Sequence, residues 1–326
     1  MTILTDLSPS SDWREPWRGR VDAEDGPEGL RWHQVIEACP SSLDPFSEPS
    51  TVLLGLASDE GVRRNQGRPG AAGGPLALRR MLANLPAEPD FRLWDAGDVV
   101  CEGEGLERAQ MLYARKVEAL LLAGQKVVGL GGGHEIGWAT ASGWLAAERA
   151  KAPEARLGLI NFDAHFDLRD APVPTSGTPF LQALREAGRM GQDLSYMAVG
   201  ISEAANTPVL FRRARETNTQ WMADEACTRE QMPLLQARLA EWLGGRDAVY
   251  MTLCLDVLPA AVAPGVSAPS ALGVAPDVVL ALMQTVASSG KLRVMDVAEL
   301  SPPFDLDHRT ARTAARMIWS SCRAWR

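Results

Sequence analysis

Two short segments, Gly131-Gly132-Gly133-His134-Glu135 and Asp163-Ala164-His165-Phe166-Asp167, decide where this chain places its sheet and its polar chemistry. Each segment follows an apolar run, residues 126–130 in the first case and 157–162 in the second. Such runs are typical of strands buried in a parallel sheet. Because open α/β sheets bind ligands at the carboxyl ends of their strands, we expect both segments at one edge of such a sheet.

The residue types in these segments are those of a hydrolytic metal centre. Alternation along an extended chain puts Asp163, His165 and Asp167 on one side. His134 arrives from a neighbouring loop, where the three preceding glycines allow close backbone packing. The chain holds only four histidines, and two of them lie here. Carboxylate and imidazole together suit a divalent ion such as Mn²⁺.

Apolar strand-like runs alternate with helical patterns from residue 51 onward. This alternation predicts an α/β fold, a three-layer α/β/α sandwich with a mainly parallel central sheet. Residues 1–50 are rich in Pro, Asp, Ser and Trp and lack periodicity, so we expect an N-terminal arm packed on a single catalytic domain, residues 51–326. We expect strands at residues 51–56, 126–130, 156–162, 196–201, 249–255 and 292–297, helices around 106–120 and 311–322, and active-site loops at 170–179 and 259–271.

The composition excludes several classes of protein. There is no apolar run of about eighteen residues, so we expect no membrane span, and residues 1–6 do not resemble a signal peptide. The five cysteines are dispersed, which favours a reducing cytoplasm over a disulfide framework. A formal net charge of −8 without a basic stripe argues against nucleic acid as a partner. A substrate that carries carboxylates would therefore have to be held by specific arginines.

Four motifs in order resemble those of the ureohydrolase (arginase/agmatinase) family: GGGHE at 131–135, NFDAHFD at 161–167, LCLD at 253–256 and AELSP at 298–302. Residues 55–79 also resemble the N-terminal region of that family. Within it, the segments at 17–22, 31–34, 175–180 and 256–269 are most similar to the bacterial formimidoylglutamases. The resemblance implies an arginase-like fold. It also implies hydrolysis of N-formimidoyl-L-glutamate to L-glutamate and formamide, a step of histidine breakdown.

The resemblance also implies two Mn²⁺ ions bridged by a hydroxide. His134, Asp163 and Asp167 would hold one ion. His165, Asp163 and Asp256 would hold the other, with Asp163 bridging both. Asp167 would also move the proton to the leaving nitrogen. Glu299 follows the position of the carboxylate that pairs with the amidinium in this family.

Cys254 departs from the family's usual pattern. The third strand of the family ends in Asp-x-Asp, and its first Asp is a second bridging ligand; this chain has Cys254 there. A thiolate can bridge metals but is soft and favours Zn, Fe or Co over Mn. Alternatively, Cys254 is a protonated, buried thiol that behaves as a small hydrophobe and leaves one metal site weak or empty.

Substrate recognition is expected at the mouth of the site. Arg169 follows Asp167 by two residues and can bind a carboxylate with two hydrogen bonds. Thr175, Ser176 and Gly177 offer donors for the α-carboxylate. The arginines from Arg63 to Arg68 are expected to stabilise a turn, and Phe180 stands where arginases carry a proton-shuttling histidine.

Two alternatives stay open from the sequence. One is an agmatinase or a guanidino-acid hydrolase of the same family, and a negative recognition element in place of Arg169 would favour agmatine. The other is a metal-poor homologue with a binding role, which only Cys254 supports. Family members often assemble, so a homo-oligomer is expected by analogy.

Overall fold

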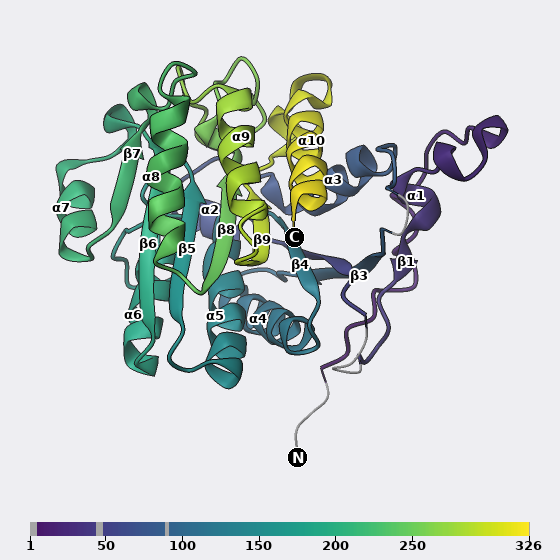
Figure 1. The fold of residues 1–326 in the computed structure, drawn as a ribbon, viewed down its shortest axis with the longest axis horizontal. Helices are drawn as coiled ribbons and strands as arrows, with labels where there is room; N and C mark the ends of the chain where they lie inside the picture. Colours follow the sequence, from purple (N-terminus) through teal and green to yellow (C-terminus); the bar gives the residue numbers. More distant parts are fainter. Residues whose placement is uncertain (1–4, 44–47, 89–90, 326) are drawn as a thin grey trace.

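A computed structural model describes residues 5–43, 48–88 and 91–325. In these residues the chain forms a nine-stranded sheet in which every neighbouring pair is parallel (Figure 1). The expected α/β fold with a mainly parallel sheet is confirmed. In spatial order the strands are β1 (Glu37–Ala38), β3 (Leu93–Val100), β2 (Thr51–Ala57), β4 (Lys126–Gly131), β9 (Leu292–Ala298), β8 (Ala248–Cys254), β5 (Arg156–Phe162), β6 (Asp193–Ile201) and β7 (Gln220–Ala223).

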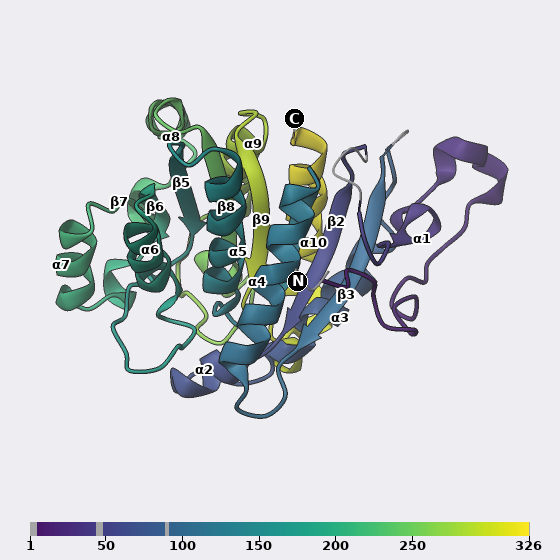
Figure 2. The ribbon, with the colours of Figure 1, turned by 90° about the horizontal axis from the view of Figure 1, so that it is seen from below.

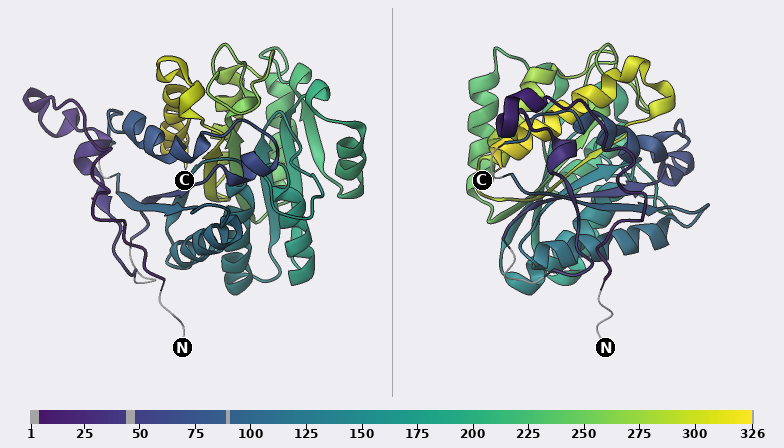
Figure 3. Two further views of the ribbon diagram at one scale, coloured as in Figure 1. Left: turned by 180° about the vertical axis from the view of Figure 1, so that it is seen from behind. Right: turned by 90° about the vertical axis from the view of Figure 1, so that its right-hand side faces the viewer.

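Helices cover both faces of this sheet and complete the three layers (Figure 2). On one face α4 packs on α5, and α5 packs on α6; on the other, α10 packs on α3 and α9, and α9 packs on α8. The right-hand view of Figure 3 shows α4 and α10 on opposite sides of the sheet. The helices are α1 (Trp32–Val35), α2 (Glu60–Arg64), α3 (Gly74–Leu82), α4 (Leu106–Leu122), α5 (Ile136–Lys151), α6 (Pro179–Met190), α7 (Pro208–Glu216), α8 (Met232–Gly244), α9 (Pro276–Ala287) and α10 (Arg309–Ala324).

The six strands expected from apolar runs are present, with ends that differ by three residues or fewer. Their side chains are almost entirely buried, because helices cover both faces. None of the helices in the described ranges combines the length and apolar character that a membrane span needs.

The sequence did not predict β1, β3 or β7, and β3 has a clear physical reason. Its apolar run is interrupted by Asp95, which is fully buried. Arg79 donates to both oxygens of this carboxylate, at 2.8 and 2.9 Å, and the Trp17 indole donates to it at 2.7 Å. A strand that buries an ion pair does not show the apolar pattern by which strands are found.

The N-terminal segment lies along the β3 edge of the sheet (Figure 3). Its strand β1 pairs with β3, and its residue Trp17 is buried against the main body. Arg14 donates to the carbonyl oxygens of His33 and Ile36, and these hydrogen bonds hold two parts of the segment together. These contacts support the proposal of an arm packed on the catalytic domain.

Candidate metal centre

The polar segments meet at the carboxyl ends of four adjacent strands, β4, β9, β8 and β5. His134 follows β4, Glu299 follows β9, Cys254 ends β8 and Asp163 follows β5. All four side chains line one cavity of about 320 Å³. Asp167, His165 and Asp256 line the same cavity. The sheet order therefore brings together residues that lie up to 165 positions apart in the sequence.

Asp163 is the centre of this cluster because its two carboxylate oxygens face two different histidines. Oδ2 lies 3.0 Å from Nδ1 of His134, and Oδ1 lies 3.4 Å from Nδ1 of His165. Asp167 Oδ2 contacts the same His134 nitrogen at 2.9 Å, and Asp256 Oδ2 lies 3.2 Å from the His165 nitrogen. The cluster thus consists of two groups of possible ligands that share one carboxylate, as a two-ion site requires.

Two buried atoms in this cluster lack a hydrogen-bond partner among the described residues: Nδ1 of His134 and Oδ1 of Asp256. The close contacts of His134 are therefore short without having hydrogen-bond geometry. Neighbouring ligands of an octahedral ion with bonds of about 2.1 Å lie about 3 Å apart. The spacing, the unpartnered atoms and the oxygen and nitrogen donors together fit divalent metal ions such as Mn²⁺.

Cys254 lies within this arrangement. Its Sγ and the ligand atoms of His134 and Asp163 all lie within 4.8 Å of one another. Burial raises the pKa of this thiol well above its usual value, and the nearby carboxylates of Asp163 and Asp256 raise it further. Without a cation the thiol is protonated, so it could bind a metal only by releasing a proton.

The pKa values of the other groups show an excess of buried negative charge. Burial opposes protonation of His134, but the close negative charges of Asp163 and Asp167 outweigh burial and raise the pKa of His134 well above the usual value. Burial, with the charges of Asp256 and Glu135, raises the pKa of Glu299 to about 8. In the absence of metal, bound protons thus offset the negative charge of the buried carboxylates, which bound cations would otherwise offset.

Two cavity residues predicted as catalytic have strained backbones. Asp167 has a φ of 50° and Glu299 a φ of 73°, in the left-handed region that non-glycine residues seldom adopt. Gln66, which also lines the cavity, has a φ of 61°. Strain of this kind persists where surrounding contacts hold it, often at functional sites. Glu299 is held by the backbone N–H of His134, which donates to its Oε1 at 2.8 Å.

A buried network beneath His134 was not predicted from the sequence. The His134 Nε2 lies 3.1 Å from Thr252 Oγ1. Beside it, Asp296 accepts hydrogen bonds from Thr140 at 2.6 Å and Tyr250 at 2.7 Å. Contacts to the second ring nitrogen fix the orientation of a metal-binding histidine. The one signal in the sequence was Asp296, a carboxylate inside the otherwise apolar β9.

The mouth of the cavity carries positive charge. Arg169 and Ser176 line it, as expected, and so does Arg68, which the sequence assigned to a structural turn. Gly177 packs against the Arg169 side chain, where a Cβ would come within 2.7 Å of Cδ. The Gly177 N–H donates to Thr175 Oγ1 at 3.2 Å, so this loop uses that donor internally, and neither Thr175 nor Gly177 lines the cavity.

Phe180 is fully buried and lies edge-on to the His134 ring, with centroids 5.1 Å apart. It therefore packs behind the metal cluster and adds no titratable group to the cavity mouth. Its backbone N–H donates to the carbonyl oxygen of Asp167 at 3.2 Å, which fixes the start of α6 beside the site.

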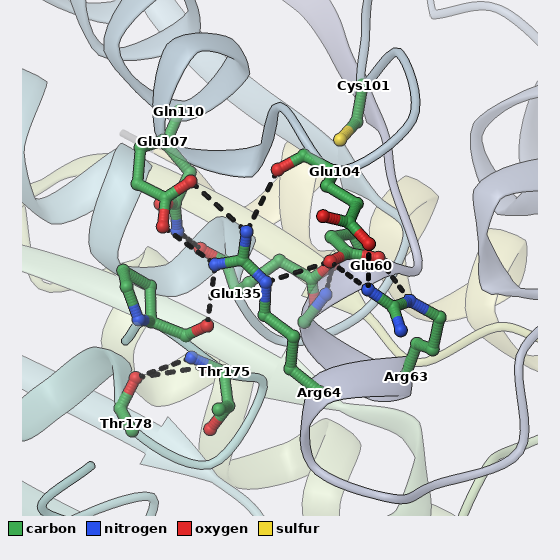
Figure 4. A network of polar contacts seen from close by, with 12 residues as sticks. Glu60, Arg63, Arg64, Cys101, Glu104, Glu107, Gln110, Glu135, Thr175 and Thr178 are labelled. Atoms are coloured by element: carbon green, nitrogen blue, oxygen red, sulfur yellow. Dashed lines mark hydrogen bonds and ion pairs between the residues drawn. The ribbon is translucent and has the colours of Figure 1, made fainter. Parts of the chain in front are cut away.

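An ion-pair network clamps the loop that carries Ser176 (Figure 4). Arg64 lies at its centre and is only 14% exposed. It contacts Glu60 at 2.8 Å and Glu107 at 2.7 Å, and donates to the carbonyl oxygens of Glu104 at 2.9 Å and Pro174 at 3.2 Å. The network thus joins α2, the start of α4 and the 170–178 loop.

Further bonds connect this network to the metal loop. The Ser176 N–H donates to the Gly61 carbonyl at 3.0 Å, and Asn65 donates to Ser176 Oγ at 3.2 Å. Glu135, which follows His134, accepts from Ser58 Oγ at 2.8 Å and from the Gly61 N–H at 3.0 Å. Helix α2 therefore connects the loop that carries Ser176 at the cavity mouth to the loop that carries His134 at the cavity base.

Comparison with known proteins places this architecture in a class. A model of the arginase family matches residues 49–323, and the chain belongs to that family. It is 48% identical to formimidoylglutamase of Ralstonia nicotianae over 305 residues, 93% of each chain. It is 47% identical to formimidoylglutamase of Rhodococcus jostii over 303 residues, again 93% of each chain.

Solved structures agree with this placement. Trypanosoma cruzi formiminoglutamase with Mn²⁺ matches with a TM-score of 0.75 and 26% identity, over 85% of this chain and 93% of that one. Formimidoylglutamase of Bacillus subtilis shares the fold, with a TM-score of 0.78 and 23% identity over 90% and 91% of the two chains.

Proposed function

We propose that this chain hydrolyses N-formimidoyl-L-glutamate to L-glutamate and formamide. The observation that carries the proposal is the division of charge in the cavity. Asp163, Asp167 and Glu299 lie at its base, whereas Arg68 and Arg169 lie at its mouth. This substrate has a positively charged amidinium on its α-nitrogen, one carboxylate on the adjacent α-carbon and a second carboxylate at the far end of its side chain. The identity to proteins named formimidoylglutamase over nearly the whole chain supports the same substrate.

Two divalent ions, which we propose to be Mn²⁺, would be held by His134, Asp163 and Asp167 and by His165, Asp163 and Asp256. Cys254 is the proposed additional ligand between the two groups. Ions in such a site lower the pKa of water and so supply a nucleophile at neutral pH. A Mn²⁺-containing structure of a formiminoglutamase with the same fold supports this choice of metal.

The chain's own residues account for the remaining requirements. Glu299 is buried beside the His134 loop and pairs with the amidinium, which orients its carbon for attack. The positive charge of the amidinium compensates the cost of ionising a buried carboxylate. Asp167 accepts a proton from the attacking water and returns it to the leaving nitrogen, so that L-glutamate departs with a neutral amino group and not as an amide anion.

Agmatinase activity is not favoured, because agmatine has no carboxylate for the arginines at the mouth. The metal-poor, non-catalytic alternative rests on Cys254 alone, whereas the other ligand positions lie at spacings that suit metal. We further propose that the enzyme works in the cytoplasm and that its reaction is a step of histidine breakdown.

A substrate panel tests the proposed function. With Mn²⁺ added, we expect kcat/KM for N-formimidoyl-L-glutamate to exceed that for arginine, agmatine or guanidinobutyrate at least about tenfold, a difference of about 1.4 kcal/mol in transition-state binding. Initial rates of formamide or urea release would be measured for each compound. Equal or faster hydrolysis of arginine would contradict the proposal.

A further inference from the structure

We propose that Arg68 and Arg169 each bind one of the substrate's two carboxylates, so that the cavity mouth selects for dicarboxylates. This inference rests on the proposed function and adds Arg68 to its specificity-determining residues. The two arginines come from different loops, one after α2 and one after β5, and both line the cavity that contains the metal cluster.

The guanidinium of Arg68 is held in one place by backbone atoms. Its Nε donates to the carbonyl oxygen of Ser267 at 2.9 Å and its Nη2 to that of Val266 at 2.5 Å. The guanidinium lies over the Phe304 ring, 4.1 Å from its centroid. These contacts orient the group without neutralising it, because carbonyl oxygens and an aromatic ring carry no net charge.

The backbone before Arg68 is shaped to bring it there. Gln66 adopts the left-handed conformation, with a φ of 61°, and Gly67 follows. A Cβ at Gly67 would lie 2.5 Å from Ser267 Oγ and 2.8 Å from a Val62 methyl group, so only glycine allows this close approach. The Arg68 N–H then donates to Ser267 Oγ at 2.8 Å. The strained backbone of Gln66 and the close packing of Gly67 thus place the exposed Arg68 at the cavity mouth.

The neighbouring arginines, Arg63 and Arg64, differ from Arg68 because they form ion pairs within the protein. Arg63 and Arg64 both pair with Glu60, and Arg64 also pairs with Glu107. In the described part of the chain, neither Arg68 nor Arg169 forms an ion pair. The two arginines that line the cavity therefore keep charges that anionic groups of a ligand can balance.

The chemistry of the substrates explains why two such groups matter. N-formimidoyl-L-glutamate carries two carboxylates, whereas guanidinobutyrate carries one and agmatine none. Arginine has one carboxylate and an α-ammonium group, which a second guanidinium would repel. Each planar guanidinium can bind one carboxylate with two parallel hydrogen bonds. Arg68 therefore adds discrimination that Arg169 alone does not provide.

A cycle of variants and substrates tests this assignment. Wild type, Arg68→Met and Arg169→Met would be assayed with three compounds. The first is N-formimidoyl-L-glutamate; the second is N-formimidoyl-L-glutamine, which lacks the γ-carboxylate; the third is N-formimidoyl-4-aminobutyrate, which lacks the α-carboxylate. We expect each variant to lose about 10- to 100-fold in kcat/KM on the full substrate, mainly through KM.

The two variants should then show a crossed pattern. On the analogue that lacks the carboxylate bound by the substituted arginine, the variant should have nearly the same kcat/KM as wild type. On the other analogue, its kcat/KM should fall below that of wild type. Arg68→Lys keeps the charge and should recover part of the loss. Arg309→Met is the matched control, because Arg309 is also exposed and donates to a backbone carbonyl, that of Ala261 at 3.0 Å, but does not line the cavity. It should match wild type.

Equal loss by Arg68→Met on all three compounds, or no loss on any, overturns the assignment of Arg68. Failure of the proposed function is a separate result, since wild type itself would then not hydrolyse N-formimidoyl-L-glutamate. Competitive inhibition by L-glutamate, which carries both carboxylates, measures the binding of a ligand that is not itself hydrolysed. Its inhibition constant should rise in both arginine variants and stay unchanged in Arg309→Met.

Discussion

At the scale of single residues, we propose that Asp163 and Cys254 determine how many ions the centre can hold. Asp163 directs one oxygen at each histidine, so it can serve two ions at once. Cys254 lies beside the His134 group, where a second bridging carboxylate is usual in the family. A carboxylate offers two hard oxygens, whereas a thiolate offers one soft sulfur with longer bonds. The two residues therefore affect Mn²⁺ binding in opposite directions.

We expect Cys254→Asp to bring Mn²⁺ occupancy closer to two per chain and to increase Mn²⁺-dependent activity. The change restores a hard ligand at nearly unchanged side-chain volume, and burial already keeps the thiol protonated in the absence of a cation. Metal content would be measured after dialysis of both proteins against Mn²⁺.

Cys254→Ser is the control for this substitution, because it conserves size but adds no carboxylate. It should not increase occupancy. If wild type already retains two Mn²⁺ per chain and Cys254→Asp changes nothing, the second site is not compromised by the cysteine.

The residues of the cluster differ in how far the sequence could predict them. His134, Asp163 and Asp167 stand in short motifs directly after apolar runs, so local pattern and resemblance were enough. Arg68 meets Ser267 across 199 positions, and His134 meets Thr252 across 118. No local pattern encodes such contacts. They depend on how the sheet orders its strands and how the loops then pack.

At the scale of elements, the short helix α2 contacts the loop that carries His134 and holds the 170–178 loop at the cavity mouth in place. Its Gly61 carbonyl accepts from Ser176, and its Arg64 binds the Pro174 carbonyl. The 170–178 loop has little apolar burial near its tip, where residues 170–173 are exposed. Its order therefore depends on this clamp.

We expect Arg64→Met to raise KM several-fold and to lower the free energy of unfolding by about 1 to 2 kcal/mol. The substitution removes partly buried charge-assisted hydrogen bonds to Glu60 and Glu107 and releases Pro174. Hydrogen exchange at the Ser176 amide should become faster, because that N–H is protected by its bond to Gly61.

Arg63→Met is the matched control on the same helix. Arg63 is 53% exposed and contacts Glu60 and Glu104 without contacting the loop. It should leave KM and Ser176 exchange unchanged. Equal effects of the two substitutions would show that α2 itself, and not the Arg64 contacts, orders the loop.

Elements also mark where sequence patterns stop being informative. Strands buried between two helical layers appear as apolar runs and were found almost residue by residue. Strand β3 was missed because it carries the buried Asp95, which forms an ion pair with Arg79 of α3. Strands β1 and β7 are short, with two and four residues, and lie at the sheet edges, where half-exposed side chains follow no clean period.

At the scale of the whole molecule, local charge and net charge oppose each other. The chain carries a net charge of −8, which does not attract a dicarboxylate from solution. Recognition therefore depends on the two arginines at the cavity mouth, within the range where salt does not fully screen them. At the base of the cavity, the carboxylates of Asp163, Asp167, Asp256 and Glu299 favour divalent cations.

Metal should consequently stabilise the entire fold. The proposed ligands lie at the ends of β4, β5 and β8 and are brought together only in the native state. At free Mn²⁺ about 100 times the dissociation constant, the gain is about 2.7 kcal/mol, or roughly 4 °C in Tm for a chain of this length. Thermal unfolding would be followed with and without Mn²⁺. Asp163→Asn, nearly isosteric, removes the shared ligand charge and should reduce the gain.

The stabilisation by metal should also grow as pH rises from about 5.5 to 7.5. In the metal-free protein, Asp163, Asp167 and Asp256 raise the pKa of His134 and His165 well above the usual value, although burial opposes this. Protons on these rings thus stabilise the metal-free fold most below the unfolded histidine pKa of about 6.5, and this contribution is lost as pH rises through the raised values. Metal must displace the same protons, so its binding weakens at low pH. A shift in Tm with Mn²⁺ that is the same at pH 5.5 and 7.5 would show that neither histidine gives up a proton to the metal.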